Sequence, residues 1–324
     1  MDKRVIGGIE VSGLCLGAMM FGTTVDEDTS FALLDTFFEA GGTFIDTANC
    51  YQFWAGDGQG HESEELLGRW LKSRGLATGA GREQIVIATK VGARPDRERG
   101  DSWPANIEGL STQVVTSQVD VSLRRMGLDY VDLYYSHHED RTVPLEETVG
   151  AFASVAESGK ARALGVSNEP TWRIERARRI AASHAWPSYV CVQQRHTYLQ
   201  PRPGAYDAFM PAASGELLDY VREEEDVTLV AYWSLMGGAY TDRADKRIDP
   251  MYDHPGASAR LAALRSVADE LGATPNQVVL AWMRASSPSI LPLFSASSVT
   301  QLKESLGSTE LTLTPDQMER LDQA

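Results

Sequence analysis

The chain has 324 residues, of which 43% are hydrophobic, and its 45 acidic and 30 basic side chains give a net charge of −15. This acidic balance argues against nucleic acid or an anionic membrane as a partner. No apolar run approaches the roughly 20 residues that span a bilayer, and the N-terminus lacks the apolar core of a signal peptide. The three cysteines are widely spaced, which suits a reducing compartment, so we expect a cytoplasmic protein.

Short apolar or β-branched runs alternate with helical patterns along almost the whole chain. After an opening hairpin at residues 4–13, we predict strands at residues 14–16, 43–46, 85–89, 131–135, 162–166, 190–193, 228–232 and 290–293. Helices are predicted at residues 29–40, 63–74, 114–126, 145–158, 171–183, 215–224, 258–271, 275–285 and 300–306.

Eight strands, each followed by helix without an intervening linker, indicate one domain over residues 1–324. The predicted fold is an α/β (β/α)8 TIM barrel with an N-terminal β-hairpin and a C-terminal helical extension. The alternative is an open doubly wound sheet, but no Gly-rich dinucleotide fingerprint follows the first strand. The glycines of Gly56–Gly60 follow no strand directly, and we expect a flexible loop there.

Four polar residues lie where successive predicted strands end. Asp46 ends the second barrel strand, and Tyr51 lies just beyond it. Lys90 and His137 end the third and fourth strands. Because the carboxyl ends of barrel strands share one mouth, we expect these four side chains to lie side by side.

These four side chains together suit proton transfer to a carbonyl compound. A free phenol has a pKa of about 10, but a nearby ammonium favours the phenolate, so we expect Lys90 to lower the pKa of Tyr51. Asp46 can hold Lys90 in place, and His137 can orient a carbonyl oxygen. The sequence therefore predicts proton delivery to an oxyanion as hydride reaches carbon.

The chain resembles the aldo-keto reductase family over nearly its whole length. The matching segments are D-T-A-N-C-Y (46–51), E-S-E-E-L-L-G (62–68), A-T-K-V-G (88–92), V-D-L-Y-Y-S-H (131–137), G-V-S-N (165–168), A-Y-W-S-L (231–235) and P-N-Q-V-V-L-A-W (275–282). The resemblance implies a barrel oxidoreductase that reversibly transfers hydride between a nicotinamide cofactor and an aldehyde or ketone. It also implies the catalytic tetrad Asp46, Tyr51, Lys90 and His137, with Tyr51 as general acid for reduction and base for oxidation.

Two histidines stand next to each other at the end of the fourth strand. The family pattern D-L-Y-x-x-H selects His137 over His138. Strand alternation is expected to point the two imidazoles to opposite faces, so we do not expect a metal pair.

Cofactor contacts are also implied by the resemblance. Ser167, Asn168 and Gln193 match residues that hydrogen-bond the carboxamide. Met19 and Met20 match first-strand residues near the nicotinamide ribose. The remaining implied cofactor positions are Asp46, then Trp233, Ser234, Leu235 and Gly238 in the loop that wraps the pyrophosphate, and Ser295, Ser297, Gln301 and Ser305 around the adenosine.

Two positions depart from the family pattern. His196 stands where an aromatic residue usually stacks on the nicotinamide; an imidazole can stack with less area, or the register places Tyr198 there. Ser297 stands where many members have an Arg for the 2′-phosphate, and Lys303 could replace that guanidinium only in part. NADP(H) is favoured on family grounds, and NAD(H) is the alternative.

Three aromatic residues are the candidates for binding the substrate. Phe53 and Trp54 lie in the loop after Tyr51, and Trp103 lies in the loop after Lys90. They suit a small-molecule carbonyl or alcohol substrate, sugar-like or polyhydroxylated, or equally they are rim packing. Two other function classes are a cofactor-bound redox-sensing or regulatory subunit with slow turnover, and a metal-dependent barrel hydrolase. The first strand lacks the H-x-H of such hydrolases, so no metal is expected.

Overall fold

Parallel strands form the centre of the protein. The computed structural model describes residues 1–96, 98, 100, 102–241 and 245–324. Within these ranges the strands close into a barrel in the order β10-β3-β4-β5-β6-β7-β8-β9. Their bounds are β3 Cys15–Gly17, β4 Phe44–Asp46, β5 Val86–Val91, β6 Val131–Ser136, β7 Ala161–Ser167, β8 Tyr189–Arg195, β9 Thr228–Tyr232 and β10 Ile290–Phe294. The predicted barrel is confirmed, and the open-sheet alternative is wrong because β10 pairs with β3.

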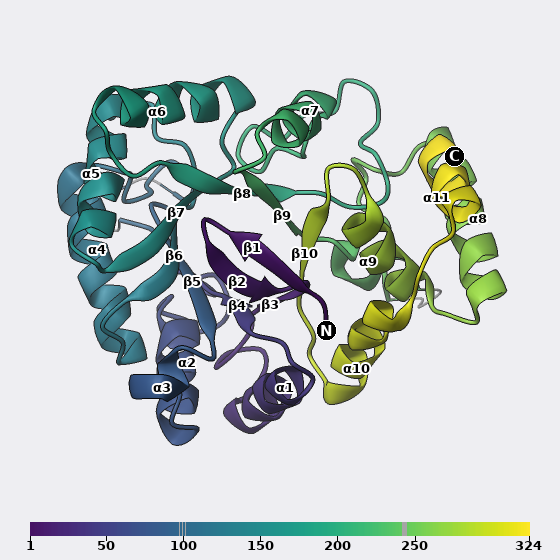
Figure 1. Ribbon diagram of the computed structural model, residues 1–324, viewed down its shortest axis with the longest axis horizontal. Coiled ribbons are helices and arrows are strands. Elements are labelled where there is room, and N and C mark those ends of the chain that lie inside the picture. The colour runs from purple at the N-terminus through teal and green to yellow at the C-terminus, as the bar shows by residue number, and fades with distance from the viewer. Residues whose placement is uncertain (97, 99, 101, 242–244) are drawn as a thin grey trace.

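Helices surround this ring of strands (Figure 1). They are α1 Glu27–Glu39, α2 Glu62–Ser73, α3 Gly79–Arg82, α4 Thr112–Met126, α5 Leu145–Glu157, α6 Thr171–Ser183, α7 Gly215–Glu223, α8 Pro255–Leu271, α9 Pro275–Ala285, α10 Val299–Gly307 and α11 Pro315–Gln323, with the 3-10 turns η2 Met236–Gly238 and η3 Ser308–Glu310. None of the helices in the described ranges has the length and apolar character needed to cross a bilayer.

The last helix, α11, was missed by the prediction from the sequence. Its amphipathic pattern is short and mostly polar, with Leu321 fully buried. A capping box does mark its start, since the Thr314 and Gln317 side chains each bond the other's backbone N–H and Pro315 occupies the first turn. The helix packs on α8 at the right of Figure 1 and forms the C-terminal extension.

Alternation along the strands produces two hydrophobic cores. Side chains such as Phe44, Ala88 and Leu133 point inward and fill the barrel, whereas Ile45 and Ile87 point outward against the helices. A filled interior leaves room for polar chemistry only above the last inward-facing layer, at the carboxyl ends of the strands.

The opposite end of the barrel is covered by the predicted hairpin of β1 Lys3–Ile6 and β2 Ile9–Ser12. In Figure 1 this purple hairpin lies across the middle of the strand ring. Ile6 and Ile9 are buried in the same cluster as the barrel interior. The Ser12 hydroxyl accepts the backbone N–H of Phe44 at 3.1 Å, which ties the hairpin to β4.

Gly68 sets the distance between α2 and α4, and we predict that Gly68→Ala destabilises the fold. A Cβ at this position would lie 2.5 Å from the carbonyl oxygen of Arg125 and 2.8 Å from the Cα of Met126. Backbone cannot yield as a flexible side chain does, so we expect a loss of about 1–3 kcal/mol, measured as the shift in urea unfolding.

The matched control is Gly215→Ala at the start of α7, where an added Cβ meets nothing within 4 Å. This variant should be neutral or stabilising by up to ~1 kcal/mol. Equal unfolding midpoints for the two variants would contradict the close approach of α2 and α4.

Candidate active site

Asp46, Lys90 and His137 lie at the mouth because they continue the inward-facing rows of their strands. On β4 and β5, Asp46 follows Phe44 and Lys90 follows Ala88 at a spacing of two residues. His137 stands just past β6, two residues after the inward-facing Tyr135. The strand pairing β4-β5-β6 then brings the three rows together, as the sequence predicted.

Lys90 is the centre of the cluster and is fully buried. Its ammonium donates to the Asp46 carboxylate, to the Thr47 carbonyl oxygen at 2.8 Å and to the Tyr51 hydroxyl oxygen at 2.7 Å. The second oxygen of Asp46 accepts from the Gln193 amide at 2.9 Å. Every hydrogen of this ammonium therefore has an acceptor, which is the condition for burying a charge.

Tyr51 and His137 stand next to each other at the open side of the cluster. Their rings meet edge to face with centroids 5.7 Å apart, and both side chains are only partly buried. The Cys50 thiol lies 3.8 Å from Nδ1 of His137. A hydroxyl and an imidazole at one partly open position can both reach the same oxygen of a bound molecule.

The protonation of these two groups follows from their burial. Burial raises the pKa of Tyr51 well above its ordinary value, and the Asp46 carboxylate adds to the rise. The lowering that we expected from Lys90 is therefore wrong, because desolvation of the phenolate outweighs the ammonium. Burial, with help from His138 and Lys90, keeps the pKa of His137 well below its usual range. Tyr51 is thus a phenol and His137 a neutral imidazole near pH 7.

His138 does not point to the opposite face, contrary to expectation. The rings of His137 and His138 stack with centroids 5.1 Å apart and planes at 16°. The pleat of β6 ends at Ser136, so strand alternation no longer determines the direction of His138. In the described part of the chain, no group of three or more His, Cys, Asp or Glu side chains is arranged to hold a metal.

The predicted carboxamide set lies at the ends of β7 and β8. The Asn168 amide donates to the carbonyl oxygen of His137 at 2.9 Å and to the Ser167 hydroxyl at 3.1 Å. Its oxygen accepts from the Tyr232 hydroxyl at 2.7 Å. Asn168 therefore also braces the loop that carries His137, while Gln193 braces Asp46.

Met19 and Met20, two of the predicted cofactor residues, lie in a turn that begins beside Asp46. The N–H of Ala18 donates to the carbonyl oxygen of Asp46 at 2.8 Å, so the turn holding Met19 and Met20 begins next to that strand end. Met19 is exposed and Met20 is partly buried.

The loop after β9 is a tight turn with several residues in the left-handed region. Trp233, Met236, Gly237 and Gly238 have positive φ angles of 61°, 48°, 61° and 91°. Within the loop the N–H of Met236 donates to the carbonyl oxygen of Trp233 at 2.9 Å, and the N–H of Gly238 donates to that of Leu235 at 2.8 Å, so the turn is held by its own backbone. The Ser234 hydroxyl donates to the carbonyl oxygens of Ala231 and Leu293, which fixes the loop to the barrel. Of the predicted residues, Leu235 is partly buried here.

The predicted adenosine loop surrounds the start of α10. Ser295 and Ser297 are exposed, and both the N–H and the hydroxyl of Ser297 bond the side-chain oxygen of Gln301 at 3.0 Å. Ser305 is buried on the inner face of the helix. The segment from residue 292 to residue 302 contains no Lys or Arg. These eleven residues therefore offer hydroxyl and amide groups but no positively charged side chain.

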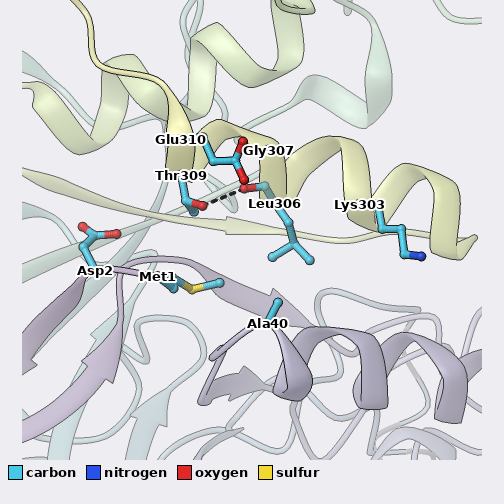
Figure 2. A pocket seen from close by; sticks show the side chains of 8 residues that line it. All are labelled: Met1, Asp2, Ala40, Lys303, Leu306, Gly307, Thr309 and Glu310. Atoms are coloured by element: carbon cyan, nitrogen blue, oxygen red, sulfur yellow. Dashed lines mark hydrogen bonds between the residues drawn. The ribbon is translucent and has the colours of Figure 1, made fainter.

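Lys303 belongs to a different part of the surface. It lines a cavity of about 590 Å³ with Met1, Asp2, Ala40 and Glu310 among its neighbours (Figure 2). Ala40 caps α1 and leads into the start of β4, so this cavity lies toward the hairpin end of the barrel. The tetrad lies at the other end.

His196 and Tyr198, the two residues considered for stacking on the nicotinamide, differ in how deeply they are buried. Tyr198 is fully buried, its hydroxyl donates to the carbonyl oxygen of Leu321 in α11 at 3.1 Å, and its ring packs on Trp282. Tyr198 therefore faces the C-terminal extension and not the mouth. His196 also lies against Trp282, with centroids 5.9 Å apart, but remains partly exposed.

The three predicted substrate residues form a continuous row of rings at the rim. Phe53 contacts Trp54 at 4.8 Å and Trp103 at 5.6 Å between ring centroids. Trp103 in turn meets Phe209 edge to face at 4.8 Å. Phe209, in the loop after β8, was not predicted because a single ring in an irregular segment gives no periodic signal.

A buried ionic network under the Tyr51 loop was also missed. Glu64 of α2 is fully buried, accepts from the Thr89 hydroxyl at 2.7 Å and pairs with Arg125 of α4 at 2.8 Å. Arg125 also donates to the carbonyl oxygen of Asn49 at 3.2 Å. The helices thereby hold the loop from Asp46 to Tyr51 from below. The E-S-E-E-L-L-G motif contains Glu64, but its sequence carries no signal for the partner in α4.

Comparison with known proteins agrees with this architecture. The Aldo/keto reductase family profile matches residues 13–324. The chain is 30% identical to an uncharacterized oxidoreductase, YrpG, of Bacillus subtilis over 97% of its length and 92% of the relative's. It is 31% identical to norsolorinic acid reductase B of Aspergillus parasiticus, covering 98% of this chain and 81% of that one.

Two further similarities concern a relative named as a dehydrogenase and a solved structure. Aryl-alcohol dehydrogenase [NADP(+)] of Phanerodontia chrysosporium is 28% identical over 97% of this chain and 83% of its own. The crystal structure of the thermostable aldo-keto reductase Tm1743 with the inhibitor epalrestat superposes with a TM-score of 0.75 at 28% identity, covering 100% of this chain and 99% of that one. The chain belongs to the Aldo/keto reductase family and is an oxidoreductase of the barrel type.

Proposed function

We propose that the protein reversibly transfers hydride between NADP(H) and an aldehyde or ketone in the cytoplasm, with Asp46, Tyr51, Lys90 and His137 as its catalytic residues. The observation that carries this proposal is the buried ammonium of Lys90, held 2.7 Å from the Tyr51 hydroxyl oxygen. Family membership supports the reaction class.

Tyr51 acts as the proton donor in this proposal. When bound, the dihydronicotinamide supplies the hydride that the carbonyl carbon accepts. The Tyr51 hydroxyl passes its proton to the carbonyl oxygen as negative charge develops there, and the product is an alcohol. Lys90, already donating to the phenol oxygen, stabilises the charge that remains on Tyr51. The neutral imidazole of His137 offers an N–H to the same carbonyl oxygen.

Asp46 and Gln193 serve this step indirectly. Asp46 balances the charge of Lys90, and the Gln193 amide holds the free oxygen of Asp46. Both fix the ammonium in the barrel before a substrate arrives, so little reorganisation is needed in the transition state.

The chain offers a fitting place for a nicotinamide cofactor. Ser167, Asn168 and Gln193 supply neutral polar groups beside the tetrad, since Asn168 bonds the His137 carbonyl oxygen and Gln193 bonds Asp46. The tight turn of residues 233–238 matches in position the loop that the family resemblance assigns to the pyrophosphate. The relative named for NADP(+) supports NADP(H), whereas the adenosine loop argues for weak discrimination against NAD(H).

Aromatic aldehydes and ketones are the first substrates to test. Two of the relatives are named for aryl alcohols and for norsolorinic acid. The row of rings formed by Phe53, Trp54, Trp103 and Phe209 supports an aromatic partner over a sugar-like one, because flat rings gain from ring contacts.

Tyr51→Phe is expected to lower turnover at least ~100-fold, because it removes the proton donor and leaves the surrounding packing intact. Cofactor affinity, measured by fluorescence titration, should change by less than about threefold. The matched control is Tyr206→Phe, which removes a hydroxyl from a tyrosine that is 72% exposed and should leave turnover unchanged. Retained activity in Tyr51→Phe would refute the mechanism.

The rate of carbonyl reduction should depend little on pH near neutrality. Tyr51 carries its proton below a pKa raised above its ordinary value, and His137 is neutral above a pKa that burial lowers. Both are in their working forms between about pH 6.5 and 10. We expect kcat at saturating cofactor to vary less than about twofold over this range. A tenfold fall between pH 7 and pH 9, as for a phenol of lowered pKa, would contradict the protonation of Tyr51.

Cofactor preference can be tested at Ser297. The wild-type kcat/KM should be higher with NADPH than with NADH, and Ser297→Arg should raise that ratio by roughly 10- to 100-fold, the effect of one charge-assisted contact to phosphate. The control Ser297→Ala should leave the ratio near the wild-type value. Equal or higher efficiency of the wild type with NADH would overturn the assignment to NADP(H).

A further inference from the structure

Phe209 is fixed to the catalytic loop by His138. The two rings stack with centroids 3.8 Å apart and planes at 18°. Nδ1 of His138 also lies 3.0 Å from the carbonyl oxygen of Phe209. A carbonyl oxygen only accepts, so Nδ1 carries the hydrogen and donates. Burial lowers the pKa of His138 to about 4, which keeps the ring neutral and this tautomer in place at pH 7.

The loop around Phe209 is fixed by polar contacts as well. The Asp207 carboxylate accepts the backbone N–H groups of Phe209 at 3.0 Å and Met210 at 2.9 Å. Asp207 in turn pairs with Arg195 at the end of β8 at 3.3 Å. The Gln194 amide donates to the carbonyl oxygen of Pro211 at 2.6 Å. Phe209 is therefore held by the barrel from its own loop and by His138 from the neighbouring loop.

Phe209 connects the catalytic imidazole to the rim. His137 stacks on His138, His138 on Phe209, and the Phe209 ring meets the face or edge of Trp103 at 82°. The Trp103 indole donates to the carbonyl oxygen of Ala93 at 3.1 Å, which fixes the outer end. Four loops thus contribute to one row of rings that starts at a catalytic residue and includes Phe53.

We propose that Phe209 determines the substrate class by offering its ring to a planar aromatic group attached to the carbonyl, and that His138 is a positioning residue that acts through Phe209. This inference rests on the proposed function. Phe209 is only partly buried, so part of its ring remains exposed at the rim. An aromatic substrate ring gains from such a contact beyond the area it buries, whereas a saturated ring of similar size gains only the area.

The test measures kcat/KM for benzaldehyde and for cyclohexanecarbaldehyde in wild type and variants, and takes the ratio of the two values for each protein. The intrinsic reactivities of the aldehydes cancel when this ratio is compared between wild type and variant. Phe209→Leu keeps apolar bulk but removes the ring, and should lower the aromatic preference about three- to tenfold, mainly through KM. Phe209→Tyr keeps the ring and should stay within about twofold of wild type. His138→Ala should shift the ratio in the same direction as Phe209→Leu.

The matched control is Tyr206→Leu, in the same loop but 72% exposed, which should leave the ratio unchanged. A purely structural role for His138 would lower the efficiency with both aldehydes in equal proportion and would leave their ratio near wild type. That result, or an unchanged ratio in Phe209→Leu, would overturn the proposal.

Failure of the proposed function is distinguishable from failure of this inference. If the wild type reduces neither aldehyde with NADPH or NADH, the proposed function fails. Calorimetric titration with benzyl alcohol and cyclohexylmethanol, with and without NADP⁺, then tests the ring preference without turnover. Equal affinity of the wild type for the two alcohols would overturn the role of Phe209, and a preference for benzyl alcohol that Phe209→Leu removes would support it.

Discussion

The burial of one ammonium constrains the whole upper end of this barrel. Lys90 is completely removed from water, and an unpaired charge there would cost several kcal/mol. Its three acceptors come from the strand end at Asp46 and from the following turn that carries Tyr51. The Glu64–Arg125 pair of α2 and α4 supports that turn, and the Gln193 amide of β8 donates to the other oxygen of Asp46. The same contacts that make the charge tolerable also fix the geometry of the site.

Most of the fold was predictable because its signals are local. Each barrel strand is a short β-branched or apolar run, and each long helix has a periodic apolar face. The hydrophobic pattern alone therefore predicts which segments are strands and which are helices. The elements that were missed have weak local signals. α3 is a single turn, and α11 is a polar helix whose stability comes from packing on α8 and from the Trp282 indole, which donates to Asp322 at 2.7 Å. Contacts between segments so distant in the chain leave no trace in a sequence window.

For the site, the sequence indicated which side chains meet but not how their environments act on them. Strand alternation and the family resemblance were enough to bring Asp46, Lys90 and Tyr51 together. They gave the wrong direction for the pKa of Tyr51, because the depth of burial depends on neighbours from many strands. Alternation also gave the wrong side for His138, since β6 ends at Ser136, two residues before His138. Phe209 could not be predicted, because its role depends on its contacts with His138 and Trp103, which lie far from it in the sequence.

The hairpin at the bottom of the barrel has a kinetic consequence. Because β1 and β2 cover that end and bury Ile6 and Ile9 in the barrel cluster, we expect molecules to approach the tetrad from the strand-carboxyl side. In the proposed reaction two compounds then share one entrance, and the rings of the rim stand over it. Whichever compound lies deeper has to arrive first and depart last. We therefore expect the closed floor to produce an order of binding that no individual catalytic side chain specifies.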